Sequence, residues 1–281
     1  MPSPDAVVFQ LNNGLNNGGG FFSVFFFMCT AYLHAKSLGV PFFIEHVKWP
    51  YTVREGWHDY FTTLKVKPVV PRYPNSLRSG HMVTGVHPQF TAGAYSQCIR
   101  ELFQLRPELI ERVNRLREHI GHDYTAIFVR RGDKSRETAP TPFAEILPLI
   151  PYTSSTVFFI QTDDYTVVEE AEACLPGRRI VSTVPPTKRG SYHSNEFLKD
   201  DTRNKYKSSI VSLESKSRQA VWEETSEMLV GLTVCLLAPS CWTDVTSNVG
   251  RFLKIANPSA HTYPRETPVD PNGACNPAFG L

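Results

Sequence analysis

The sequence lacks the short motifs of several common enzyme classes. It has no Gly-x-Ser-x-Gly, which would indicate a hydrolase nucleophile, no GxxxxGK[ST] phosphate loop and no HExxH zinc site. Its six cysteines form no Cys-x-x-Cys pair, so we do not expect a zinc site. Because they are scattered singly through 281 residues, we expect reduced thiols and a cytoplasmic setting.

An excess of one charge and a long apolar run are also missing. The chain has 29 Lys and Arg against 27 Asp and Glu, and this balance argues against a dedicated nucleic-acid-binding protein. The N-terminus shows no basic stretch followed by an apolar one, so no secretory signal is predicted. The most apolar run, 21–32, is shorter than the roughly 20 residues that span a membrane, and we expect a buried helix there.

The first part of the chain predicts a strand, a glycine-rich loop, a helix and a second strand. Apolar runs over 7–11 and 40–46 predict the strands, and the apolar helix lies between them. Just before that helix come Gly18, Gly19 and Gly20. These glycines form either a flexible turn or a backbone cradle for a phosphate or sugar at the helix N-terminus.

The second part alternates between strand-like and helical patterns, which is typical of an α/β fold with a parallel sheet. The expected strands lie at 124–129, 156–160, 179–182 and 241–245, and the expected helices at 165–174, 220–237 and 248–255. A regular helix over 107–120 precedes them, whereas 48–88 shows no clear pattern. The sequence therefore predicts a first domain over 1–120, a second over 121–256 and a proline-rich tail over 257–281.

Three polar clusters follow three of the expected strands. They are Arg130-Arg131-Gly132-Asp133-Lys134, Gln161-Thr162-Asp163-Asp164 and Thr246-Ser247-Asn248. In an open α/β sheet, ligands bind at the edge where the carboxyl ends of the strands meet. We therefore expect the three clusters to share one crevice.

The paired arginines are the strongest candidates for an anion site. A guanidinium fork matches phosphate oxygens, so Arg130 and Arg131 are predicted to bind a phosphate group. The alternative is a structural network with Asp133, Asp163 or Asp164.

The other clusters leave a similar choice. Ser247 and Asn248, with Thr246 beside them, either cap the following helix or help its N-terminus to bind phosphate. Asp163 and Asp164 are candidates for the ligand site, and the alternative is that Asp164 or Thr162 is simply the N-cap of the next helix. Their spacing is not the DxD that holds a metal against a diphosphate, so we expect no essential metal, and the arginines would supply the positive charge.

One further carboxylate could carry out acid–base chemistry. Glu137 follows shortly after Lys134, and a carboxylate held near an ammonium group can act as a general base. A surface acid is the alternative. The basic, tyrosine-containing run 188–207 is expected to be a solvated loop.

These motifs, in this order, resemble those of alpha-1,6-fucosyltransferases and the related nodulation and protein O-fucosyltransferases. FVRRGDK (128–134) resembles their HVRRTDK-type motif, FFIQTDD their ATDD strand end, and TSNVGRF (246–252) their SSQVxR motif. The glycine loop with the apolar helix is similar to their N-terminal GxGxQ–helix–strand unit. The resemblance covers 7–255.

The resemblance implies a GT-B-like α/β fold, in which two Rossmann-type domains face a central cleft. It also implies an inverting, metal-independent transfer of a sugar from a nucleotide diphosphate. By position, Arg130 would hold the donor β-phosphate, and Arg131 and Asp133 would support it.

The remaining roles follow from the same resemblance. Ser247 and Asn248, together with Thr246, would bind the donor diphosphate, and Gly18–Gly20 would approach the donor from the other domain. Lys134 and Glu137 would form the catalytic base pair, although the family spacing is one residue longer.

Two departures from the family concern the donor base. Phe128 stands where the family has a histidine, and Gly231 stands where it has the carboxylate that reads guanine. The donor is therefore left open between GDP-fucose and UDP-xylose. The acceptor is expected to be an oligosaccharide or glycoprotein glycan, and neither nucleic acid nor a membrane is an expected partner.

The short chain, which shows no anchor or stem, looks like a bacterial or large-virus member of the family. Two other functions stay open. One is a non-catalytic glycan- or nucleotide-binding protein on the same fold, and the other is a sugar-phosphate transferase.

Overall fold

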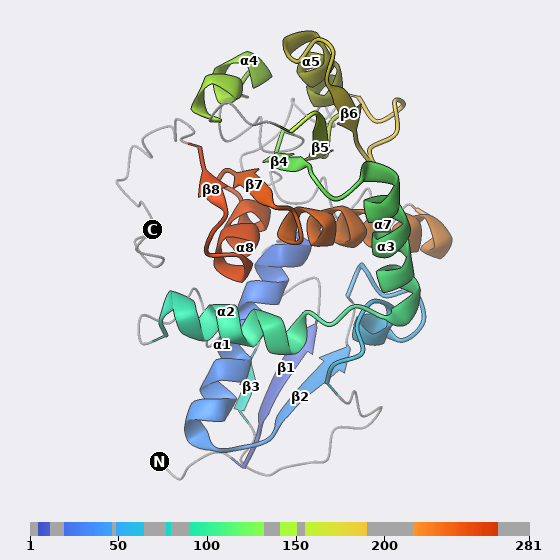
Figure 1. Ribbon diagram of the computed structural model, residues 1–281. Coiled ribbons are helices and arrows are strands. Elements are labelled where there is room, and N and C mark those ends of the chain that lie inside the picture. Colours follow the sequence, from blue (N-terminus) through green and yellow to red (C-terminus); the bar gives the residue numbers. More distant parts are fainter. Residues whose placement is uncertain are drawn as a thin grey trace, which may run out of the picture. The chain divides into compact units, whose positions relative to one another are not determined.

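The computed structural model describes residues 5–11, 20–46, 49–64, 77–79, 90–131, 141–150, 155–189 and 216–263. These residues form two compact units, each with a parallel sheet of its own (Figure 1). The first unit holds the described residues up to Pro107 together with 216–225. The second holds the others, from Glu108 onwards.

The first unit contains the predicted strand–helix–strand arrangement. Strands β1 (Val7–Leu11) and β2 (Phe42–His46) pair in parallel and are joined by helix α1 (Phe21–Leu38). A third strand, β3 (Leu77–Ser79), pairs with the other edge of β1 and gives the order β2-β1-β3. It lies in the region where the sequence showed no pattern.

Helix α1 is the core helix of this unit. Its length and hydropathy would also suit a membrane span, but 56% of that stretch is buried within the protein. Its phenylalanines meet rings from the turn around the short 3-10 helix Gly56–Asp59, where Trp57 stacks on Phe61 with ring centroids 4.0 Å apart. Helix α2 (Ala92–Leu102), which the sequence analysis did not predict, packs against α1.

The second unit is built on a five-stranded parallel sheet. Its strands are β4 (Thr125–Val129), β5 (Val157–Thr162), β6 (Arg179–Val181), β7 (Ser240–Thr243) and β8 (His261–Thr262), in the order β6-β5-β4-β7-β8. The first four agree with the predicted strands to within a few residues. The last is a correction, because it lies in the expected tail and pairs with the end of β7.

Helices cover both faces of this sheet. They are α3 (Pro107–Ile120), α4 (Phe143–Ile146), α5 (Thr166–Cys174), α7 (Arg218–Leu236), of which the first unit holds the part up to Thr225, and α8 (Asn248–Ala256). Helices α4 and α5 bury one face in a cluster that includes Ile127, Ile160 and Trp242 (Figure 1). Helix α7 lies on the other face, where its Gly231 meets the side chain of Gln161. This apolar burial on both sides is why the strands read as continuous hydrophobic runs.

The unit boundary differs from the one expected at residue 120. Helix α3 belongs with the second unit from Glu108 onwards. Arg179 of β6 donates hydrogen bonds to the carbonyl oxygens of His119 at 2.8 Å and Ile120 at 3.4 Å, which ties the end of α3 to this sheet. Such a contact between distant segments leaves no trace in the local sequence pattern.

The cysteines of the described residues are free thiols, and most are buried. They are Cys29, Cys98, Cys174, Cys235 and Cys241, whereas Cys275 lies outside the described residues. Burial raises the pKa of the Cys29 and Cys235 thiols well above the usual range. These thiols are therefore core side chains and not nucleophiles.

Candidate functional site

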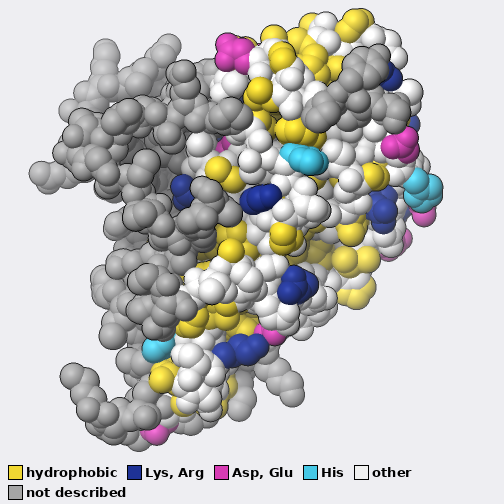
Figure 2. All heavy atoms as spheres, turned by 60° about the vertical axis from the view of Figure 1, so that its left-hand side comes forward, with side chains coloured by type: hydrophobic (Ala, Val, Ile, Leu, Met, Phe, Trp, Pro, Cys, Tyr) yellow, Lys and Arg dark blue, Asp and Glu magenta, His cyan; other side chains and the backbone are white. Residues whose placement is uncertain are grey.

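The order of the strands brings the described residues of the three polar clusters to one edge. Strands β5, β4 and β7 are neighbours in the sheet and run in parallel, so the segments that follow them leave from the same side. On the face drawn in Figure 2, the basic side chains of the described residues stand apart from one another. Any anion site on this face is therefore built locally.

Arg130 lies at this edge beside Asp163. Val129 pairs with Thr162 across the β4–β5 ladder, so the next residue of each strand is also a neighbour. Arg130 Nη1 forms an ion pair with Asp163 Oδ2, and the Arg130 side chain keeps 27% of its surface exposed. A guanidinium has five N–H donors in a planar fork, so it can contact more than one acceptor group.

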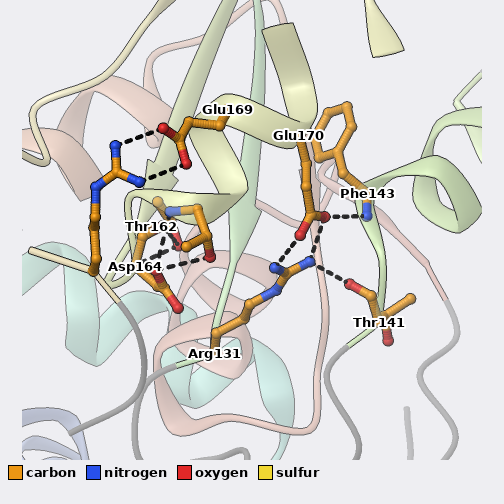
Figure 3. Close-up of polar contacts among 9 residues, drawn as sticks. Arg131, Thr141, Phe143, Thr162, Asp164, Glu169 and Glu170 are labelled. Atoms are coloured by element: carbon orange, nitrogen blue, oxygen red, sulfur yellow. Dashed lines mark hydrogen bonds and ion pairs between the residues drawn. The ribbon is translucent and has the colours of Figure 1, made fainter. Parts of the chain in front are cut away.

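Arg131 points into the protein. Its guanidinium forms a two-pronged ion pair with Glu170 of α5, at 2.5 and 2.6 Å, and Nη2 also donates to the Thr141 carbonyl oxygen at 3.0 Å (Figure 3). Hydrogen bonds from Arg131 are also the main cause that lowers the pKa of Glu170 below 4.5. Arg131 is therefore part of a structural network, which was the alternative to phosphate binding. Its side-chain partner is Glu170, which the sequence analysis did not consider.

The start of α8 is closed by its own side chains. Ser247 Oγ accepts a hydrogen bond from the Gly250 N–H at 3.0 Å and therefore caps the helix. Asn248 Oδ1 accepts from Arg251 Nη1 at 3.4 Å, and Arg251 Nε donates to the Val245 carbonyl oxygen at 2.9 Å. Ser247 already uses the Gly250 N–H, so what favours an anion at this helix start is the positive end of the helix dipole.

The same local turn occurs after β5 and after β7. Asp164 Oδ1 accepts from the backbone N–H of Thr166 at 3.0 Å and from its hydroxyl at 2.8 Å. Asp244 Oδ1 accepts from the corresponding groups of Thr246 at 3.0 and 2.7 Å. Asp164 therefore closes a local turn before α5, but it is not the N-cap that the sequence offered as an alternative, because the N-cap residue is Tyr165. Asp244, at the same edge of the sheet, is a residue that the sequence analysis missed.

Helix α8 packs very closely on the end of β7. A Cβ atom on Gly250 would lie only 1.6 Å from the Asp244 carbonyl oxygen, so only glycine fits here. Burial lowers the pKa of Arg251, and the charge of Asp244 opposes this effect. Arg251 lies in the TSNVGRF run that carries the resemblance, and that run was the signal that could have identified it.

The two positions at which the sequence departs from the motifs it resembles, Phe128 and Gly231, are both neighbours of Gln161. Phe128 pairs with Gln161 across the ladder, and a Cβ atom on Gly231 would meet Gln161 Oε1 at 1.8 Å. The Gln161 amide is therefore packed against the helix position where the family has a carboxylate. Gln161 Oε1 also accepts from the Thr183 hydroxyl at 3.4 Å.

Several predicted site residues belong to the first unit or lie outside the described residues. Gly18, Gly19, Asp133, Lys134 and Glu137 lie outside the described residues. Gly20 belongs to the first unit, where it is the N-cap residue of α1 in an extended conformation. The Phe21 N–H that follows it donates to the Tyr51 hydroxyl at 3.0 Å.

Comparisons with known proteins place the chain by its fold. No protein-family model matches it, and no curated protein matches it by sequence. The structure of NodZ alpha-1,6-fucosyltransferase soaked with GDP-fucose is similar, with a TM-score of 0.59, 14% identity and coverage of 91% of this chain and 93% of that one. Fucosyltransferase NodZ from Bradyrhizobium gives a TM-score of 0.57 and 13% identity over 89% and 92% of the two chains. The protein therefore has the α/β, GT-B-like fold of these fucosyltransferases, as its motifs predicted.

Proposed function

We propose that the protein is an inverting, metal-independent glycosyltransferase. It would transfer fucose or xylose from GDP-fucose or UDP-xylose to a hydroxyl group of a glycan. The observation that carries the proposal is the sheet edge on which Arg130 and the N-terminus of α8 come from neighbouring strands. The similarity of the fold to that of NodZ, which was soaked with GDP-fucose and co-crystallised with GDP, supports the proposal.

The donor diphosphate would lie between Arg130 and α8. The helix N-terminus favours negative charge, and the partly exposed guanidinium adds a full positive charge. Ser247 holds the first turn of the helix in place through its bond with the Gly250 N–H. Arg131 and Asp163 keep Arg130 at the edge, because Asp163 accepts both from the Arg130 side chain and from the Arg131 N–H at 2.8 Å.

The proposed reaction is a single displacement. A carboxylate, for which Glu137 beside Lys134 is the candidate, takes the proton of the acceptor hydroxyl. The acceptor oxygen bonds to the anomeric carbon as the bond to the diphosphate breaks, and the configuration inverts. The leaving diphosphate keeps the electron pair, and Arg130 stabilises the developing charge. We further propose that the enzyme works in the cytoplasm.

Nucleotide binding and sugar transfer test this proposal in two steps. The first is a thermal-shift panel of GDP, UDP, ADP and simple sugar phosphates, since a ligand at 100 times its Kd stabilises the folded state by about 2.7 kcal/mol. The second is transfer or hydrolysis of GDP-fucose and UDP-xylose. A nucleotide that binds without any turnover would favour the non-catalytic binding protein instead.

A pair of arginine variants tests the role of Arg130. Removing one key electrostatic group costs about 100- to 1000-fold in kcat, so we expect Arg130→Ala to lose most activity while its circular dichroism is unchanged. Arg115→Ala is the matched control, because Arg115 is exposed on α3 and pairs only weakly with Glu111 at 3.4 Å. Full activity of Arg130→Ala would refute the assignment.

A further inference from the structure

We propose that Glu170 of α5 is a positioning residue that fixes Arg130 and both ends of the connection between β4 and α4. The proposal rests on the function proposed above. Glu170 does not lie next to any polar motif of the sequence, and its role follows from the side chains it holds together. In Figure 3 its carboxylate lies between the Arg131 guanidinium and the Phe143 backbone.

The carboxylate of Glu170 joins two segments of the chain. On one side it accepts hydrogen bonds from Nη1 and Nη2 of Arg131, the residue directly after Arg130. On the other side Oε2 accepts the Phe143 N–H at 2.9 Å, while Arg131 Nη2 donates to the Thr141 carbonyl oxygen at 3.0 Å. Arg131 and the Phe143 N–H therefore meet at one carboxylate, although 132–142 separates these two residues in the sequence.

The Arg131 half of this contact is buried, whereas the Glu170 side chain keeps 37% of its surface exposed. The Arg131 side chain is only 10% exposed, and its backbone N–H is bound to Asp163 Oδ1 at 2.8 Å. Removal of the Glu170 charge would leave a buried guanidinium without its counter-ion, which is strongly unfavourable. Because Arg131 is held at its side chain and at its backbone, the direction in which Arg130 leaves the strand is fixed as well.

The contact bears on the chemistry through Arg130. Arg130 is the residue directly before Arg131 and is proposed to stabilise the charge that develops on the leaving diphosphate. A displacement of about 1 Å in a reacting group can reduce the rate by about 100-fold. Loss of the contact should therefore lower kcat more than it changes donor binding.

A neighbouring ion pair supplies a matched control. Glu169, the residue before Glu170, makes a two-pronged contact with Arg189 at 2.5 and 3.0 Å (Figure 3). Both of these side chains are about half exposed, and neither contacts Arg131 or the 141–143 segment among the described residues. Glu169→Gln thus removes the same kind of bond from the same helix without touching the proposed contact.

The test compares three variants with the wild type. Glu170→Gln should lower kcat by about 10- to 100-fold and leave the donor KM within about threefold, while Glu169→Gln keeps the wild-type kcat. Arg131→Met combined with Glu170→Met removes the uncompensated charge at similar volume, so it should fold and still show the low kcat. Hydrogen exchange of the Phe143 amide should accelerate in both Glu170 variants and not in Glu169→Gln.

The outcomes separate this proposal from the proposed function. The positioning role alone would be overturned if folded Glu170→Gln and the double variant both kept the wild-type kcat. It would also be overturned if Glu169→Gln lost as much kcat as Glu170→Gln. Unchanged exchange at Phe143 would also overturn it, whether or not a donor has been found. A wild-type protein that neither binds nor turns over a nucleotide sugar would refute the proposed function and the positioning role with it.

Discussion

Replacement of Gly250 by alanine tests how the proposed phosphate-binding turn is held. In an exposed helix the change would stabilise the protein by about 1 kcal/mol, because glycine is a poor helix former. At this position the new Cβ atom would lie 1.6 Å from the Asp244 carbonyl oxygen, whereas ordinary contact starts at 3.4 Å. The atom that must yield is backbone, so α8 has to move away from β7 by about 1.8 Å.

The cost has two parts. Forced overpacking costs about 1–3 kcal/mol, and displacement of α8 weakens the bond from the Gly250 N–H to Ser247, which as a cap is worth about 1 kcal/mol. We therefore expect Gly250→Ala to lower the free energy of unfolding by about 2 kcal/mol after the helix-propensity gain. The nucleotide-induced thermal shift should fall as well.

Chemical denaturation followed by tryptophan fluorescence measures the effect, since Trp242 lies in β7 of the same unit. Gly93→Ala is the control, because Gly93 also lies in the first turn of a helix but its Cβ atom would meet nothing closer than 3.7 Å. Gly93→Ala should be neutral or stabilising. If Gly250→Ala behaved in the same way, the close packing of α8 on β7 would be wrong.

Three further predictions concern the same edge. Ser247→Ala should lower the free energy of unfolding by about 1 kcal/mol, because the helix loses its cap. Ser247→Asp should keep most of the wild-type stability, because aspartate can also cap the helix. Equal stability of Ser247→Ala and the wild type would contradict the capping role. Arg131 holds the pKa of Glu170 below 4.5, so the ionised carboxylate contributes stability above that pH and loses the contribution as the pH falls through the lowered folded value. The stability difference between the wild type and Glu170→Gln should therefore be constant near pH 6 to 7 and shrink below about pH 4.5 in urea titrations, and a difference that grew in acid would refute this linkage. Transfer activity should persist after dialysis against EDTA, and its loss, with recovery on adding Mg²⁺ or Mn²⁺, would overturn metal independence.

The sequence predicts the sheet of the second unit well because its signals are local. Buried strands such as β4 and β5 are continuous apolar runs, and polar residues mark where they end. That strands β5, β4 and β7 are direct neighbours is known only from the structure, since the sequence predicted no strand order and only a shared edge for the three clusters. The capping alternative for Ser247 could also be read directly, because a serine before a helical run is a common N-cap.

The roles of individual polar side chains could not be predicted in this way. Arg130 and Arg131 are identical residues in adjacent positions, yet one is partly exposed and the other is buried against Glu170. The partner lies 39 residues away on a helix, and nothing in its neighbourhood distinguishes it from Glu169. Likewise the end of α3 is tied to the second unit by Arg179, a contact that only the folded chain creates.

The paired aspartate–threonine turns after β5 and β7 have a consequence for divergence. Each turn is closed within three residues by one carboxylate oxygen, so its hydrogen bonds are made between residues close together in the sequence. Turns that are closed by such local bonds allow the sequence elsewhere in the chain to change while the edge of the sheet keeps its structure. Local turns of this kind offer a physical route by which two chains can have the same fold at 14% identity, as this protein and NodZ do.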